Sequence, residues 1–230
     1  MFAKTIVSVF AAVATLTSAA NAYKYDRLSR NDSALLVVDI QEGLFQLVHD
    51  IEPREYRNNI LAFSALGVYF DLPTVLTTSA ETGPNGPFPP EILADHPKAP
   101  YIKRNGEVNA WDNADFRNAV KALGKKQLIV AGITTDVCVT FLSLSLREAG
   151  YDVFVVAEAS GTFDATTAAL SNDRMRDAGV HIMSFFSVAC ELMRDWRQAP
   201  GSVEIAQKWF GKYLPNYAAL YDSWVSISNA

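Results

Sequence analysis

Cysteine and histidine are scarce in this sequence, which has two cysteines and three histidines among its 230 residues. Two cysteines do not make a disulfide framework, although an exported protein could pair Cys138 with Cys190. The histidines (His49, His96 and His181) are scattered and lack the spacing of metal ligands. A disulfide-rich scaffold and a metal site are therefore not expected, and a catalytic Cys–His pair could arise only through folding.

Basic blocks and phosphate-binding motifs are also missing. The formal net charge is −5, without any basic run, which gives no support for a nucleic-acid or anionic-membrane partner. No G-x-G-x-x-G motif follows the first apolar run, and "GPNGPFPP" (83–90) has neither the lysine nor the helix of a phosphate loop. We interpret that segment as a stiff loop in preference to a substrate lid, and we predict no cofactor.

The first 22 residues differ in composition from the rest of the chain. They read "MFAKTIVSVFAAVATLTSAANA", with an early Lys4, an apolar run and the small-residue ending Ala20-Asn21-Ala22. This is the pattern of a secretory signal peptide, and the run is too short for a comfortable membrane span. We expect cleavage after Ala22 and a secreted domain over residues 23–230. The alternatives are an uncleaved anchor or an irregular start to the domain, and a cytoplasmic protein if the segment is not used.

From residue 34 onward, short apolar runs alternate with segments of helical periodicity. The runs are rich in Val, Ile and Leu, as in strands covered on both faces: "ALLVVDI" (34–40), "PTVLTTS" (73–79), "PYIKR" (100–104), "QLIVAGI" (127–133), "DVFVVAE" (152–158) and "HIMSFFS" (181–187). The helical segments are 56–71, 113–124, 139–150 and 165–179, and the last three end at a glycine suited to a C-cap. This order predicts one three-layer α/β/α domain with right-handed crossovers.

In such a sheet, reactive side chains collect just beyond the carboxyl ends of the strands. The candidates at these ends are Asp39, Ser79, Lys103 or Arg104, residues 134–138 and Glu158. Asp39 could be a general base or a helix N-cap. Lys103 and Arg104 point to opposite faces, so at most one of them enters a given site, and either could instead be a solvated strand end. A buried cation beside Asp39 would keep the carboxylate ionised.

Cys138 lies in "ITTDVCV" (133–139), one turn into the helix predicted after the fourth run. Thr134, Thr135 and Asp136 are each plausible N-caps, which places Cys138 where free backbone N–H groups and the helix dipole favour a thiolate. The same N–H groups could stabilise an oxyanion. On position alone, a cysteine here is nearly as often a small core residue as a nucleophile.

Three further segments are candidates for a role in the site or in packing. Asn109 and Trp111 in "NAWDN" could line a pocket, as could Ser79, although Asp112 or Asn113 as a cap for the next helix is the simpler account. Cys190 lies in the apolar helical pattern "FFSVACELMRDW" and is interpreted as a core residue. The aromatic-rich tail (203–224) is expected to pack on the domain or on a neighbouring subunit.

Taken together and in order, "LLVVDIQEGL", "YIKRNGEVNAWDN" and "LIVAGITTDVCV" resemble the isochorismatase-like cysteine hydrolases. The resemblance runs from about Tyr23 to the C-terminal region. Segments such as "LPTVLTTSAETGPNGP", "EASGTF" and "FFSVACELMRDW" are most similar to the YcaC-type subgroup. Each motif is weak alone, whereas their combination in one order is specific.

The resemblance implies a six-stranded parallel sheet and a triad of aspartate, basic residue and cysteine. Asp39 and Cys138 match its first and last members, and the subgroup pattern places the basic residue at Arg104, with Lys103 as the alternative. The family also implies a cis peptide between Ile133 and Thr134, which would turn the Thr134 N–H toward an oxyanion beside that of Cys138. The metal-binding branch carries a histidine after the second strand, and "LTTSAETG" has none, so no metal is expected.

The activity implied is hydrolysis of a small amide or carbamoyl compound through a thioester on Cys138. Vinyl-ether hydrolysis of isochorismate is a second possibility, but family members with that chemistry do not require a nucleophilic cysteine. A third is a secreted interaction protein that uses the fold without turnover. The expected partners are a small-molecule substrate and further copies of the chain, because YcaC-type proteins are oligomeric. A reactive thiol is at risk in an oxidising compartment, so Cys138 must be protected or residues 1–22 serve another purpose.

Overall fold

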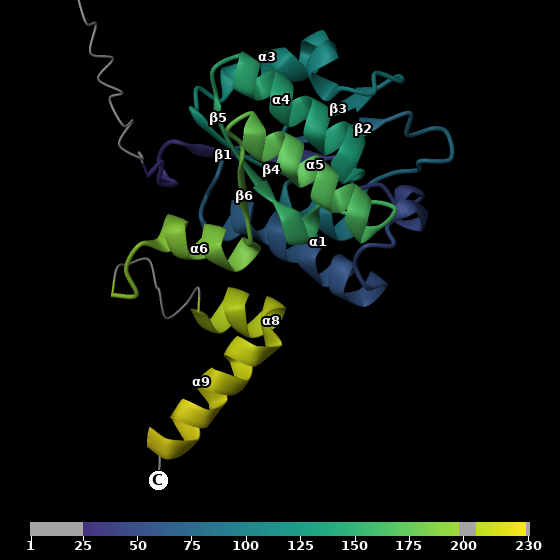
Figure 1. Ribbon diagram of the computed structural model, residues 1–230. Helices are drawn as coiled ribbons and strands as arrows, with labels where there is room; N and C mark the ends of the chain where they lie inside the picture. Colours follow the sequence, from purple (N-terminus) through teal and green to yellow (C-terminus); the bar gives the residue numbers. More distant parts are fainter. Residues whose placement is uncertain (1–24, 198–205, 229–230) are drawn as a thin grey trace, which may run out of the picture.

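The computed structural model describes residues 25–197 and 206–228, and the segment predicted as a signal peptide lies outside them. Six parallel strands form one sheet in the order β3-β2-β1-β4-β5-β6. The strands are β1 (Ser33–Val38), β2 (Thr74–Ser79), β3 (Tyr101–Arg104), β4 (Gln127–Gly132), β5 (Asp152–Val156) and β6 (His181–Met183). The predicted fold class, a parallel sheet covered by helices on both faces, is confirmed (Figure 1).

The strands are buried because both faces of the sheet are covered. In β1, Leu35 and Val37 belong to one core cluster, whereas Ala34, Leu36 and Val38 belong to the other. Side chains alternate between the faces of a strand, so a strand covered on both sides needs an almost continuous apolar run. For this reason the apolar runs of the sequence predicted strand boundaries close to those observed.

Helices complete the two outer layers (Figure 1). The first core cluster contains residues of α1 (Pro53–Tyr69) and α6 (Phe185–Met193). The second contains residues of α3 (Ala114–Ala122), α4 (Thr140–Glu148) and α5 (Ala165–Asp177). Three glycines that follow helices have positive φ, as predicted: Gly124 (63°), Gly150 (87°) and Gly179 (78°).

Helix starts are fixed by side-chain caps. Asn113 accepts a hydrogen bond from the Phe116 N–H at 3.0 Å, which confirms one of the two capping residues considered for this helix. Ser184 accepts from the Ser187 N–H at 3.1 Å and starts α6 directly after β6. The predicted strand 181–187 is therefore too long, because the capping serine ends it after Met183 and the apolar residues that follow are helical.

Short elements occupy the connections. They are η1 (Leu44–Leu47), α2 (Pro90–Asp95), η2 (Ala110–Asp112), η3 (Thr135–Val139), η4 (Ala157–Ala159), η5 (Ala206–Phe210) and α8 (Gly211–Tyr213). The proline-rich segment predicted to be a stiff loop is held by backbone bonds, from Glu42 N to Pro87 O and from Gly43 N to Asn85 O, each 2.9 Å. Among the described residues, no helix has the length and apolarity that crossing a membrane requires.

The first half of the described tail packs on the domain, which is one of the two outcomes expected for it. Trp209, Phe210 and Tyr213 are buried, and the Trp209 indole N–H donates to the Ala62 carbonyl at 3.1 Å. The tail then continues as α9 (Pro215–Ser228), which extends away from the sheet (Figure 1).

From β1 the chain adds β2 and β3 on one side of the sheet and then β4, β5 and β6 on the other side. The candidate site lies at this switch point between β1 and β4. The two strands lie side by side, with Val38 in register with Gly132. A side chain at Gly132 would place its Cβ 2.0 Å from the Val38 carbonyl oxygen, so only glycine allows this approach. In open parallel sheets, ligands bind beyond the carboxyl ends of the strands at such a switch point.

Candidate active site

Asp39 and Arg104 form a buried ion pair at the carboxyl edge of the sheet. Asp39 is 0% and Arg104 2% exposed, and the Arg104 Nη2 group donates to both carboxylate oxygens of Asp39. Arg104 Nε also donates to the Thr77 hydroxyl at 3.0 Å. Since β2 lies between β1 and β3, Thr77 supports the guanidinium as it reaches across to Asp39. Burial raises the pKa of the Asp39 carboxyl, and the ion pair opposes that rise.

The backbone around Asp39 sets the direction of its side chain. Asp39 has a φ of 54°, in the left-handed region that Asp tolerates better than most residues. Its N–H donates to the Thr77 carbonyl and its own carbonyl accepts from the Gln41 N–H, at 2.9 and 2.8 Å. The chain therefore turns sharply at the end of β1. This turn leaves the carboxylate inside the site.

Lys103 and Arg104, the two alternatives for the basic residue, lie in different surroundings. Lys103 is exposed, pairs with Glu81 at 2.9 Å and lies over the Tyr101 ring. Arg104 points the opposite way, toward Asp39. Successive residues of a strand face opposite sides, so only one of the two can enter the site.

Cys138 lies in the π-helical turn η3, which joins β4 to α4. The Val139 N–H donates to the Thr134 carbonyl at 3.1 Å, five residues back, and the wider turn is stabilised by a 2.6 Å bond from the Thr140 hydroxyl to Thr135 O. No side chain caps this turn, so the predicted caps do not act as caps. Asp136 contacts Thr162 instead, and the buried Thr135 hydroxyl has no hydrogen-bond partner among the described residues.

The half-buried Cys138 thiol and the Asp39 carboxyl group are hydrogen-bonded to each other. Burial raises the pKa of this thiol far above its ordinary value, and the adjacent Asp39 charge raises it further. Arg104 lowers it less, because the guanidinium is paired with the carboxylate. Burial and the neighbouring anion therefore act against the thiolate that the start of a helix favours.

Thr134 lies between β4 and the cysteine turn. The peptide bond between Ile133 and Thr134 is cis, and Thr134 is 7% exposed. The Thr134 N–H donates to the Cys138 sulfur. A donor that contacts the sulfur is also close to the oxygen of any carbonyl the sulfur attacks.

The loop after β5 holds the cysteine turn from the outside. Gly161 accepts from the Thr135 N–H at 3.0 Å and pairs with Ile133 in an isolated parallel bridge. The next residue, Thr162, donates its hydroxyl to Asp136 at 2.8 Å, and its N–H donates to Asp50 at 2.8 Å. Three segments far apart in sequence thereby fix the position of Cys138.

Gln41 was not among the residues singled out from the sequence, yet it organises the rim of the site. It is fully buried and accepts from the Ser79 N–H at 2.8 Å, while its amide donates to the carbonyls of Ser79 and Gly86. Ser79 is thus held by its backbone beside the site. A polar residue two positions after Asp39, inside a buried segment, was the only sequence sign of this role.

The other candidates have partners elsewhere. Asn109 donates to the Ser145 hydroxyl at 2.9 Å. Ser145 lies on α4, about two helical turns beyond Cys138. The side-chain oxygen of Asn109 accepts from the Trp111 N–H. Trp111 packs edge-on against Tyr151 at 6.0 Å between ring centroids. Glu158 accepts from the Phe185 N–H at 2.7 Å and so stabilises the start of α6. None of these contacts involves the Asp39–Cys138 pair.

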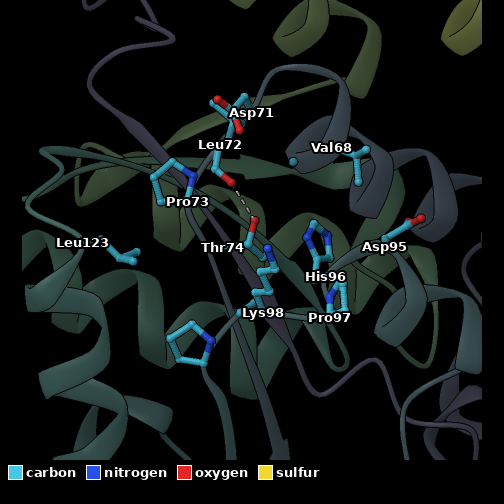
Figure 2. Close-up of a pocket in the computed structure, with 13 residues that line it drawn as sticks. Val68, Asp71, Leu72, Pro73, Thr74, Asp95, His96, Pro97, Lys98 and Leu123 are labelled. Atoms are coloured by element: carbon cyan, nitrogen blue, oxygen red, sulfur yellow. Dashed lines mark hydrogen bonds between the residues drawn. The ribbon is translucent and has the colours of Figure 1, made fainter.

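A hollow lies at the opposite edge of the sheet, beside the amino ends of β2 and β3. It has a volume of about 470 Å³, and Figure 2 shows His96 and Lys98 beside Thr74. Three of its polar side chains bond within the chain: Thr74 to the Leu72 carbonyl, His96 to the Ser64 carbonyl and Asp95 to the Ser64 hydroxyl. Residues 25–197 and 206–228 contain no cluster of three or more His, Cys, Asp or Glu side chains that could hold a metal ion.

Comparison with known proteins identifies the family to which this chain is similar. A profile of the isochorismatase domain matches residues 33–185, which include Asp39, Arg104 and Cys138. The chain is 53% identical over 204 residues to the probable hydrolase YcaC of Escherichia coli, covering 89% of this chain and 97% of that protein. It is also 27% identical to the secreted isochorismatase effector Isc1 of Phytophthora sojae, over 80% of this chain and 86% of that one.

Two solved structures of YcaC proteins share the fold. The Escherichia coli protein, described as an octameric hydrolase of unknown specificity, has a TM-score of 0.86 at 54% identity and covers 90% of this chain and 100% of its own. The Pseudomonas aeruginosa protein, solved with hexane-2,5-diol and covalent acrylamide, has a TM-score of 0.85 at 52% identity and covers 88% of this chain and 99% of its own.

Proposed function

Because this chain belongs to the isochorismatase family of hydrolases, we propose that it hydrolyses a small amide or carbamoyl compound through a thioester on Cys138. The observation that carries the proposal is the hydrogen bond from the Cys138 thiol to the buried Asp39 carboxylate, which is itself paired with Arg104. An acceptor in contact with a nucleophile is the arrangement required for its activation.

In the proposed reaction, Asp39 takes the thiol proton as Cys138 Sγ attacks the carbonyl carbon. The raised pKa of the thiol couples the two events, because a free thiolate is unfavourable beside the carboxylate. The N–H groups of Thr134 and Cys138 stabilise the tetrahedral oxyanion. Protonated Asp39 then gives its proton to the leaving amine as the C–N bond breaks and the thioester forms.

Hydrolysis of the thioester reverses these roles. Asp39, again a carboxylate, removes a proton from water as the water oxygen attacks the thioester carbon. Collapse of the second tetrahedral intermediate breaks the C–S bond, and the sulfur recovers the proton from Asp39. Arg104 exchanges no proton, because its pKa is too high, and it holds the carboxylate in place throughout.

The covalent acrylamide in the Pseudomonas relative supports a nucleophilic residue in the present chain. Acrylamide combines a primary amide with a double bond that thiols attack. Cys138 is the nucleophile we propose to form the equivalent adduct here. Isochorismate remains the second candidate substrate, favoured by the name of the Phytophthora relative, which is less similar.

Turnover assays test the proposal directly. A panel of small primary amides, carbamoyl compounds and isochorismate is assayed with the wild type and the Cys138→Ala variant. Release of ammonia from an amide or carbamoyl compound, abolished in the variant, is the expected result. Turnover of isochorismate alone, unaffected by the variant, would contradict it, as would the absence of any turnover together with no acrylamide adduct on Cys138 by mass spectrometry.

Export and assembly are proposed alongside the reaction. Residues 1–22 would direct secretion and be removed after Ala22. A half-buried thiol with a raised pKa suits an oxidising compartment, because oxidants attack the thiolate form. N-terminal sequencing of protein recovered from the medium tests the cleavage. We also propose a homo-oligomer, in keeping with the octameric Escherichia coli relative.

A further inference from the structure

Helix α9 presents large apolar side chains to solvent. Leu220, Trp224 and Ile227 are 64%, 58% and 77% exposed, and no residue of the helix is buried. Their spacing of four and three residues places them on one face of the helix, together with Tyr217 and Tyr221. Such a stripe normally faces a core, whereas here Leu220, Trp224 and Ile227 are exposed.

The inner end of this stripe is anchored on the domain. The Tyr217 ring stacks on Trp196 at 5.9 Å between centroids, with an angle of 9° between the planes, and lies 4.8 Å from Phe210. Because Phe210 is buried, this contact connects the start of α9 to the folded core. The helix then extends away from the sheet (Figure 1), and Leu220, Trp224 and Ile227 on it are exposed.

The charge of α9 also indicates a protein partner. Asp222 is its only charged residue in 14, so the helix lacks the charge pairs that support a solvated helix. It also lacks the lysines and arginines by which amphipathic helices bind anionic membranes. An apolar, nearly uncharged surface with aromatic residues is typical of obligate contacts between subunits.

We infer that α9 is an arm that packs its Leu220–Trp224–Ile227 face on a second copy of this chain. A second copy is the favoured occupant because the Escherichia coli relative, 54% identical, is an octamer. The match to that relative leaves about a tenth of this chain uncovered, roughly the length of residues 1–22, so there is room for α9 within the matched part. This inference rests on the proposed assembly and is independent of the proposed reaction.

Mass measurement by light scattering after gel filtration tests the arm. The wild type is expected as an oligomer of several 25.2 kDa chains, and the Leu220→Asp/Trp224→Asp variant as species of half that mass or less. The Leu170→Asp variant is the control, since Leu170 on α5 is equally exposed at 68%. It should keep the wild-type mass, and so should Leu220→Met/Trp224→Phe, which preserves the apolar face.

Circular dichroism distinguishes a variant that has unfolded from one that has lost only the contact of α9 with the second copy. A folded double variant with the wild-type mass would overturn the inference, as would a monomeric wild type. Flotation of the wild type with phosphatidylcholine vesicles, lost in the double variant, would assign α9 to a membrane surface instead. The Cys138→Ala variant should keep the wild-type mass, so failure of the proposed reaction and failure of the proposed arm are separate results.

Discussion

The Cys138 thiol donates its hydrogen bond to the Asp39 carboxylate across the adjacent carboxyl ends of β4 and β1. Burial and the adjacent Asp39 charge raise the pKa of this thiol, and Arg104 lowers it less. In the reaction we propose, proton removal from the thiol and attack on the substrate carbonyl are therefore coupled.

Replacement of the thiol should remove catalysis without loss of stability. In the Cys138→Ala variant we expect turnover to fall by at least about a thousandfold, as for other removed nucleophiles. The free energy of unfolding should stay within about 1 kcal/mol, because one half-buried sulfur is lost along with its unfavourable position beside Asp39. The Cys190→Ala variant is the matched control and should keep full activity. Equal activity losses in both would contradict the assignment.

Removal of one charge from the buried ion pair should be costly. In the Arg104→Met variant the Asp39 carboxylate is left buried without its cation, which typically destabilises a protein by about 3–5 kcal/mol. Chemical denaturation measures this change, and turnover should be lost as well. The Lys103→Met variant should stay within about 1 kcal/mol of the wild type, because an exposed pair with Glu81 contributes little. A larger effect at Lys103 than at Arg104 would reverse our assignment.

The raised pKa of the Cys138 thiol should make the free energy of unfolding fall at alkaline pH. The pKa of Cys138 is raised in the folded state, so above pH of about 9 the unfolded chain loses a proton that the folded chain keeps. This contribution is fully present below that pH and is lost as pH rises, by at most about 1.4 kcal/mol per pH unit. Urea unfolding at pH 8, 9 and 10 should show a steeper loss for the wild type than for Cys138→Ala. Parallel curves would exclude the raised pKa.

The hydroxyl of Thr162 should position the cysteine turn. The Thr162→Val variant removes its bond to Asp136 at constant volume, so we expect kcat to fall about tenfold with KM little changed. Asp136 is only partly buried, so loss of this hydrogen bond should cost about 1 kcal/mol of stability. Thr162→Ser should restore kcat, whereas Thr166→Val, at an exposed position of α5, should have no effect. A kcat of Thr162→Val equal to that of the wild type would show that the turn holds its geometry without this bond.

The sequence determined the sheet and its edge. Continuous Val, Ile and Leu runs can be buried only where both faces of a strand are covered, so the runs predicted six parallel strands with boundaries close to those observed. The exception was the last run, where "HIMSFFS" is apolar throughout and its composition does not distinguish strand from helix. Ser184 decided this point by capping α6.

Only the tertiary structure decided the chemical state of the site. The sequence placed Asp39, Arg104 and Cys138 at three strand ends, but it could not show that Arg104 reaches across β2 to pair with Asp39 and that Lys103 turns outward. Nor could it show that the pKa of the thiol is raised, because a pKa depends on burial and on charges from distant segments. Gln41 and Thr162 likewise acquired their roles through contacts between loops that local sequence patterns do not encode.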